Sequence, residues 1–345
     1  MGRAVIGQTI DSVLSQSFED FEYIIVDDAS PDDTAALVKS YKDRRIRLRV
    51  NESNRGIAGA RNVGLDEARG SFVMMLDHDD LFLPGKIARQ VGFMRAHPEV
   101  ALCAVQHAFL RDGKQLADEG LPADPFLFKW ILLTRSPMQT SAICMRRAFL
   151  ERHELRYRQE WAPGDDLMFY NDIAEHGIIA GLAELLTLYR YHGSNVSITD
   201  ADSMARRAAA VLSEVYRRRY QLELECEEAA MLVRVVTQKR GARSLQELQR
   251  TGSLLSRLFE AFCAQETLSP EQSRIVAADV AARWWRIVER SAKTLGPDAL
   301  GIFENVPLLC AVRPPFSRRM SAGISSRIGE SRLRRIKSLI KSGSK

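Results

Sequence analysis

The chain of 345 residues has few cysteines and no long apolar run. Its five cysteines lie at least 37 residues apart without a Cys-x-x-Cys pair, so we expect no zinc site or disulfide framework, and a reducing, cytoplasmic setting. No segment reaches the ~20 apolar residues of a membrane span. The N-terminal residues resemble neither a signal peptide nor a myristoylation site. With 46% apolar and 27% charged residues, the composition indicates an ordinary globular protein of about two domains.

Glycine and proline are scarce after residue 200, where only Gly241, Gly252 and Pro270 precede Gly296. Long helical patterns in this region predict a helical appendage over residues 201–316. The adjacent residues Trp284 and Trp285 are candidates for an acceptor groove, although in a helix at least one of them is expected in the core.

Basic residues are concentrated at the end of the chain. Residues 317–345 carry nine basic side chains and one acidic side chain, a net charge of +8, whereas the preceding residues sum to −3. Apolar residues recur there at helical spacing among the cations, as in an interfacial helix: Leu333, Ile336, Leu339 and Ile340. Our hypothesis is a peripheral contact with the inner membrane face. The simpler alternative is a solvated tail, and we expect no nucleic-acid partner.

The first 200 residues alternate helical patterns with short apolar runs, which predicts an α/β domain with a mostly parallel sheet. The expected helices cover residues 6–14, 31–41, 56–68, 84–97 and 165–176. The expected strands cover residues 23–26, 46–50, 71–76, 100–105, 139–145 and 178–189, the last interrupted at Glu184. Residues 107–138 show no clear pattern and include a loop.

Two of the predicted strands end in aspartates. The first runs into Asp27 and Asp28, and the strand before residue 77 runs into the sequence Asp-His-Asp-Asp. Ligands of open α/β sheets bind outside the carboxyl ends of the strands, so both clusters should face one crevice. Asp27 and Asp28 suit a nucleotide base or ribose, or alternatively cap a turn.

The second cluster contains Asp77, Asp79 and Asp80. Carboxylates two residues apart can bind Mg²⁺ or Mn²⁺ while phosphate oxygens of a substrate take the remaining positions. The alternative is a solvated acidic turn without a ligand.

Further candidates lie on both sides of these clusters. Asp165 and Asp166 precede an amphipathic helical pattern, where they provide either a general base or an acidic helix start favoured by the macrodipole. Arg190 and His192 follow a predicted strand and together can clamp a metal-bound diphosphate. Arg61 suits a phosphate contact or a surface ion pair equally well.

In this order, the segments resemble the glycosyltransferase family 2 pattern on a GT-A fold. The resemblance covers about residues 1–200, and the matching stretches are residues 9–34, 54–80, 164–166 and 189–197. It implies an inverting, metal-dependent transfer of a sugar from a nucleotide diphosphate sugar, most often a UDP-sugar. The implied acceptor is the hydroxyl of a saccharide or lipid-linked saccharide in surface polysaccharide or glycoconjugate synthesis.

The same resemblance implies roles for individual residues. Asp166 would be the catalytic base, with Asp165 orienting the acceptor, and Asp79 with His192 would hold Mg²⁺ or Mn²⁺. The nucleotide sugar would be bound by the remaining candidates, Asp27, Asp28, Arg61, Asp77 and Arg190.

Family members normally begin with a strand that lies between the two strands bearing the aspartates, and this chain starts where the following helix should start. We therefore expect two unpaired strand edges and a weakened core. This departure motivates an alternative function, a catalytically inactive, truncated protein that binds nucleotide sugars or acts as a scaffold. A nucleotidyltransferase is a third candidate, but the glycine-rich, basic phosphate loop that would indicate one is missing from the sequence.

Overall fold

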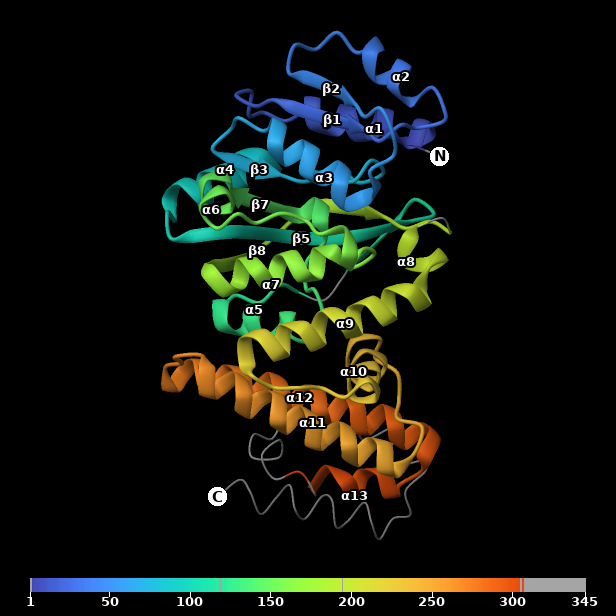
Figure 1. Ribbon diagram of the computed structural model, residues 1–345, viewed down its shortest axis with the longest axis vertical. Coiled ribbons are helices and arrows are strands. Elements are labelled where there is room, and N and C mark those ends of the chain that lie inside the picture. The colour runs from blue at the N-terminus through green and yellow to red at the C-terminus, as the bar shows by residue number, and fades with distance from the viewer. Residues whose placement is uncertain (1, 118–119, 194, 305, 307–345) are drawn as a thin grey trace. The chain divides into compact units, whose positions relative to one another are not determined.

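The computed structural model describes residues 2–117, 120–193, 195–304 and 306 (Figure 1). The chain divides into two compact units, Met1–Leu224 and Glu225–Lys345. This boundary lies beyond the expected one near residue 200, because helix α9 (Ala201–Tyr220) packs against helix α7 (Asp165–His176) in the first unit. The predicted basic tail, residues 317–345, lies outside the described residues.

The first unit begins with a small parallel sheet covered by two helices. Strand β1 (Tyr23–Asp27) pairs in parallel with β2 (Ile46–Val50). Helices α1 (Gly2–Leu14) and α2 (Thr34–Ser40) bury apolar side chains against it. Both strands and α1 were predicted. Helix α2 begins three residues later than expected, because the Asp32 side chain accepts the backbone N–H of Thr34 (3.1 Å) and holds the preceding residues in a turn.

A six-stranded sheet forms the rest of the core. Its order is β3-β7-β5-β8-β4, with β6 paired to β5. The strands are β3 (Phe72–Met74), β4 (Leu81–Phe82), β5 (Val100–Arg111), β6 (Lys114–Ala117), β7 (Ile143–Arg146) and β8 (Ile178–Arg190). Helix α4 (Lys86–Ala96) packs on β5 and β7, whereas α5 (Pro125–Leu132) and α7 pack on β8 (Figure 1).

The α/β class is confirmed, but the expectation of a mostly parallel sheet is wrong for these six strands. Only β5 and β8 pair in parallel, and the other pairs are antiparallel. One reason is the hairpin between β5 and β6, whose turn residues Asp112 and Gly113 both have positive φ (49° and 72°). A two-residue turn joins antiparallel neighbours, whereas a parallel pair needs a long crossover.

The two sheets are separate. Among the described residues, β1 pairs only with β2, and β3 pairs only with β7. One backbone edge of each strand bearing the aspartate clusters is therefore without a strand partner in the described part of the chain, as the departure from the family pattern predicts.

Strand β8 is irregular where an interruption was expected. Val105 lies opposite Leu182, but His107, two residues later, lies opposite Thr187, five residues later. Three additional residues of β8 are accommodated there, and Glu184 lies among them. The strand continues beyond this irregularity to Arg190.

Six further segments connect these elements. They are α3 (Gly56–Glu67), η1 (Thr140–Ala142), α6 (Arg147–Arg152), η2 (Gln159–Trp161), α7 and α8 (Val196–Thr199). Helices α3 and α7 begin within one residue of their predicted starts. Gly164 precedes α7 with φ +118°, a conformation that side chains rarely adopt, so the glycine permits the sharp entry into the helix.

Lys86 is fully buried at the start of α4. Its Nζ donates to Oε1 of Gln90 at 2.6 Å and lies 3.9 Å from the centre of the Phe82 ring. Burial lowers the pKa of Lys86 to about 7.

The second unit is helical, as predicted. It contains α10 (Cys226–Leu232), a π-helical turn (Val233–Thr237), α11 (Leu245–Gln265), α12 (Pro270–Leu295) and α13 (Asp298–Glu304). Trp284 is fully buried, which confirms a core tryptophan, whereas Trp285 meets Phe303 edge-on. None of the helices in the described ranges is long and apolar enough to cross a membrane.

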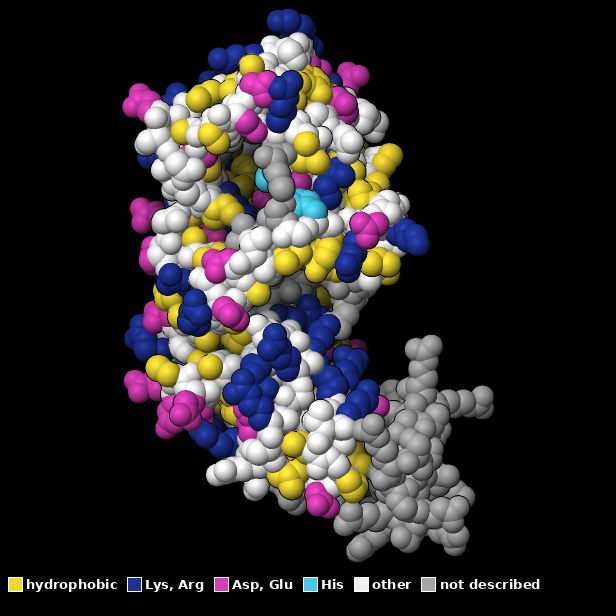
Figure 2. All heavy atoms as spheres, turned by 90° about the vertical axis from the view of Figure 1, so that its right-hand side faces the viewer, with side chains coloured by type: hydrophobic (Ala, Val, Ile, Leu, Met, Phe, Trp, Pro, Cys, Tyr) yellow, Lys and Arg dark blue, Asp and Glu magenta, His cyan; other side chains and the backbone are white. Residues whose placement is uncertain are grey.

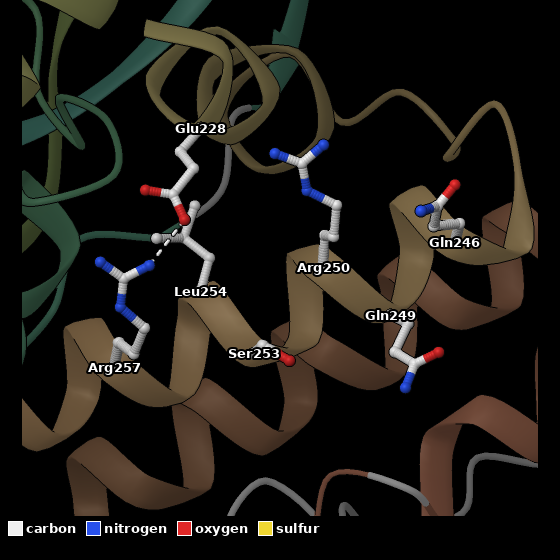
Figure 3. A pocket seen from close by; sticks show the side chains of 7 residues that line it. All are labelled: Glu228, Gln246, Gln249, Arg250, Ser253, Leu254 and Arg257. Carbon is white, nitrogen blue, oxygen red and sulfur yellow. Dashed lines mark hydrogen bonds and ion pairs between the residues drawn. The ribbon is translucent and has the colours of Figure 1, made fainter. Parts of the chain in front are cut away.

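A polar pocket of about 360 Å³ lies between α10 and α11. Figure 3 shows the ion pair between Arg257 and Glu228 (2.6 Å) on one side of it and Arg250 on the other. None of the predicted site residues lines this pocket.

Candidate active site

The turn of residues 77–80 is held in place from α1 and from η1. The hydroxyl of Thr9 donates to the backbone oxygen of His78 at 2.9 Å. The backbone N–H of Asp77 donates to Oγ of Ser141 at 3.0 Å. Figure 2 shows histidine and acidic side chains beside a hollow in the surface of the first unit.

Within this turn the aspartates differ in exposure. Asp77 is partly exposed, Asp79 is nearly buried and Asp80 is completely buried. Asp80 accepts from the Ser141 hydroxyl (2.5 Å) and from the backbone N–H of Arg190 (2.9 Å). Burial and the charge of Asp77 raise the pKa of Asp80 to about 8. Asp80 is therefore engaged inside the protein, and the other two aspartates face the site.

His192 lies beside Asp79, with 3.0 Å between Nε2 of the histidine and Oδ2 of the aspartate. Asn195 orients the segment by accepting the backbone N–H of His192 (2.6 Å) and donating to the backbone oxygen of Arg190 (3.1 Å). The guanidinium of Arg190 donates to the backbone oxygen of Asp79 (2.8 Å) and to Gln8 (2.8 Å). Arg190 thus supports the turn in this structure.

Asp27 and Asp28 have different surroundings at the end of β1. Oδ1 of Asp27 accepts the backbone N–H of Ser30 at 2.9 Å, whereas its buried Oδ2 has no hydrogen-bond partner among the described residues. Asp28 accepts from the Asn51 side chain (2.7 Å) and from the backbone N–H of Arg55 (2.9 Å). Asp28 therefore fixes the start of α3, while Asp27 retains an acceptor for a further donor.

Arg61 connects the turn to the start of α7. Its guanidinium pairs with Oδ2 of Asp165 at 3.0 Å and with Oδ1 of Asp77 at 3.4 Å. It also stacks over the Tyr157 ring, 5.2 Å from the ring centre. Although burial opposes its charge, the neighbouring acids, with Asp77 foremost, raise the pKa of Arg61. The structure thus places Arg61 between two candidate carboxylates.

Asp165 and Asp166 also differ in their surroundings. Asp165 is buried and paired with Arg61, whereas Asp166 is half-buried and accepts the backbone N–H of Leu167 (2.8 Å) in its own turn. Burial raises the pKa of Asp166, and the charge of Arg61 offsets part of this rise. A half-buried carboxylate with a raised pKa suits proton abstraction.

Sequence reasoning missed two residues of this site, Ser141 and Asn195. Neither residue type indicates such a role on its own: Ser141 acts on Asp77, 64 residues away, whereas Asn195 acts on backbone groups three and five residues before it. Asn195 lies within the matching stretch 189–197 and could have been singled out there. No local signal marks Ser141.

Comparisons with known proteins agree with this architecture. The family model described as "Glycosyl transferase family 2" matches residues 2–153. The putative teichuronic acid biosynthesis glycosyltransferase TuaG of Bacillus subtilis is 30% identical over 65% of this chain and 88% of its own length. The succinoglycan biosynthesis protein ExoO of Rhizobium meliloti is 29% identical over 85% of this chain and 88% of its own.

A solved structure shows the same fold. The crystal structure of S. aureus TarS 1–349 in complex with UDP-GlcNAc superimposes with a TM-score of 0.54 at 18% identity, covering 89% of this chain and 87% of that one. The chain spans only 33% and 63% of the length of two further relatives, both named uncharacterized glycosyltransferases, from Rickettsia bellii and Haemophilus influenzae.

Fold and site together define an α/β protein of the GT-A type with aspartate clusters at the ends of its strands. The chain belongs to glycosyl transferase family 2. The resemblance found in the sequence, and with it the glycosyltransferase class, is confirmed.

Proposed function

We propose that this chain transfers a sugar, with inversion, from a nucleotide diphosphate sugar to an acceptor hydroxyl in surface polysaccharide or glycoconjugate synthesis. One observation carries the proposal: Arg61 joins Asp77 in the turn of residues 77–80 to Asp165 at the start of α7, so the proposed donor and acceptor groups lie on either side of one guanidinium. The relatives that act in succinoglycan and teichuronic acid biosynthesis support this class of product.

The nucleotide is bound at the end of β1. The buried Oδ2 of Asp27 has no hydrogen-bond donor among the described residues, and a buried acceptor without a partner is costly unless a ligand supplies one. The imide N–H of a uracil base is a donor of the right kind; thymine has the same group, and the family pattern favours uracil. A UDP-sugar is therefore the donor we expect, with Asp77 near the ribose.

A divalent cation, Mg²⁺ or Mn²⁺, is held by Asp79 and His192. A carboxylate oxygen and an imidazole nitrogen 3.0 Å apart suit Mn²⁺ well and Mg²⁺ less well. The described residues contain no group of three potential ligands, so diphosphate oxygens and water would complete the coordination. When bound, the cation stabilises the negative charge of the departing nucleoside diphosphate.

The protein's own residues perform the remaining steps. Asp166 takes the proton of the acceptor hydroxyl as its oxygen attacks the anomeric carbon, and the rise of its pKa through burial makes it a stronger base than an ordinary aspartate. Asp165, fixed by Arg61, defines the start of α7 and so orients the acceptor. A single displacement from the face opposite the leaving group gives inversion.

Binding and turnover are tested in sequence. Calorimetry with UDP, GDP and dTDP, with and without Mn²⁺, should show metal-dependent binding of one nucleotide, and UDP binding should be strongest. Transfer is then measured with the corresponding nucleotide sugar, and the anomeric configuration of the product is determined by NMR. Retention of configuration contradicts the single displacement.

A binding or scaffold protein without turnover is the second candidate, which the unpaired edges of β1 and β3 in the described residues favour. Nucleotide binding without any transfer, also in a version extended upstream by a first strand, would support it. Binding by the extended version alone would show that the donor pocket needs the additional strand.

We further propose that the chain works in the cytoplasm at the inner membrane face, where lipid-linked acceptors lie. The basic segment 317–345 supports this proposal through its charge and apolar spacing. Co-sedimentation with anionic liposomes should decrease when residues 317–345 are removed. Unchanged co-sedimentation contradicts the membrane contact.

A further inference from the structure

Asp80 joins distant segments of the first unit from the protein interior. Its side chain is completely buried. Oδ2 accepts from the hydroxyl of Ser141 (2.5 Å), 61 residues further along the chain, and Oδ1 accepts the backbone N–H of Arg190 (2.9 Å), 110 residues further along. One carboxylate therefore ties the turn of residues 77–80 to η1 and to the end of β8.

Ser141 extends this connection to Asp77. Its buried hydroxyl donates to Asp80 while its oxygen accepts the backbone N–H of Asp77 at 3.0 Å. Both ends of the acidic turn are thus held by the same hydroxyl group. The backbone position of Asp77 depends on a side chain that does not itself face the site.

Arg190 extends the connection in the other direction. Its Nε donates to the backbone oxygen of Asp79 (2.8 Å), and its own carbonyl accepts from the Asn195 amide (3.1 Å). Asn195 in turn accepts the backbone N–H of His192 (2.6 Å). The separation of His192 from Asp79 is therefore set by contacts that lead back to Asp80.

We propose that Asp80 and Ser141 are positioning residues that fix the spacing of Asp77, Asp79 and His192 before the donor binds. The inference rests on the proposed function of those three side chains as the donor and metal site. Preorganisation raises affinity because the segments need not be ordered at the moment of binding. Both oxygens of Asp80 already have donors inside the protein, so it acts through its neighbours.

The principal test is the variant Ser141→Ala, which removes the donor to Asp80 and the acceptor for the backbone of Asp77. Calorimetry is performed with the nucleotide that the wild-type chain binds in the presence of Mn²⁺. We expect about tenfold weaker binding, the size expected when buried polar groups are left without a hydrogen-bond partner. The Mn²⁺ concentration that gives half-maximal nucleotide binding should rise as well.

Ser291→Ala in the helical unit is the matched control. Ser291 is also completely buried, and its hydroxyl also accepts a backbone N–H, that of Ala242, at 2.9 Å. Thermal unfolding of both variants measures the general cost of losing a buried hydroxyl. Nucleotide affinity and Mn²⁺ dependence should change in Ser141→Ala and remain at the wild-type value in Ser291→Ala.

The possible results distinguish a failure of the positioning role from a failure of the proposed function. If the wild-type chain binds the nucleotide and Ser141→Ala binds it with the same affinity, the positioning role is overturned while the proposed function stands. No nucleotide binding by the wild-type chain contradicts the proposed function, and the positioning role falls with it.

A second variant tests the proposal if Ser141→Ala does not fold. If Ser141→Ala shows no cooperative unfolding, Asp80→Asn is measured instead, because its amide oxygen still accepts the backbone N–H of Arg190 while its NH2 group cannot accept the Ser141 hydroxyl. We expect about threefold weaker binding in a folded protein. Wild-type affinity in Asp80→Asn overturns the proposal.

Discussion

Two regions of the first unit each contain a pair of adjacent aspartates. The turn of residues 77–80 contains Asp79 and Asp80, and the start of α7 contains Asp165 and Asp166. In each pair one carboxylate is buried and bound by the protein, Asp80 by Ser141 and Asp165 by Arg61. The other member has no such interior partner among the described residues: Asp79 is 7% exposed and lies beside His192, and Asp166 is half-buried. The order is opposite, since the buried member is second in the turn and first in the helix. Adjacent identical residues can therefore have separate tasks, which the surrounding fold assigns.

The strongest test of this division is Asp166→Asn. The amide can still accept the backbone N–H of Leu167 but cannot take a proton, so we expect sugar transfer to fall by about 10³-fold. Nucleotide binding should stay within twofold of wild type, as measured by calorimetry. Glu175→Gln, an exposed acid on the same helix, is the control and should keep its activity. Wild-type transfer by Asp166→Asn would show that another group is the base.

The buried member of the same pair should instead affect stability. Asp165→Ala removes the shorter of the two ion pairs of the nearly buried Arg61 and leaves the longer one with Asp77, so we expect the free energy of unfolding to decrease by about 2–4 kcal/mol. Urea denaturation measures this change. Asp166→Asn should change the same quantity by less than about 1 kcal/mol. If the free energy of unfolding decreases equally in the two variants, Asp165 and Asp166 do not differ in their contribution to stability.

The pH dependence of transfer addresses the half-buried member directly. Asp166 must be deprotonated to act as a base, and burial raises its pKa above the ordinary aspartate range. The rate of transfer should therefore be lost as the pH falls through this raised pKa, about tenfold per unit below it. The acid limb of the kcat profile should lie above pH ~4, the ordinary aspartate value. An acid limb at or below that value contradicts the assignment.

A third pair, Asp27 and Asp28, extends the comparison with smaller effects. Asp27→Asn replaces part of a carboxylate whose Oδ2 has no partner among the described residues, so nucleotide binding should weaken about fivefold with little change in stability. Asp28→Asn should lower the free energy of unfolding by about 1 kcal/mol, because it loosens the contacts with Asn51 and Arg55. Calorimetry should detect the larger loss of nucleotide affinity in Asp27→Asn, and urea denaturation should detect the larger loss of stability in Asp28→Asn.

Much of the local structure could be predicted from the sequence because it depends on local patterns. The strand at residues 46–50 and the helix at 165–176 match their predicted bounds. The strand directions could not be predicted from periodicity alone, because periodicity is the same for parallel and antiparallel strands; the turn at Asp112 and Gly113 sets the direction of one pair.

The candidate site shows a similar limit. Strand ends predicted the positions of the aspartates, because apolar runs followed by acids are visible in a sequence. Which member of each pair is buried depends on Ser141 and Arg61, whose partners lie 61 and 104 residues away. Contacts between residues so far apart produce no periodic pattern in the sequence. Which aspartate of each pair is bound by the protein could therefore be read only from the structure.

The irregular segment of β8 has a consequence for the chain's tolerance of length changes. Three additional residues of β8 are accommodated between the pairs Val105–Leu182 and His107–Thr187. Side chains alternate between the faces of a strand, so deleting one residue there would turn every following side chain to the opposite face. The side chains of residues 187–190, which precede His192, would then lie on the other face of the sheet. Insertions and deletions between residues 183 and 186 should therefore be tolerated only where the alternation is restored before Arg190.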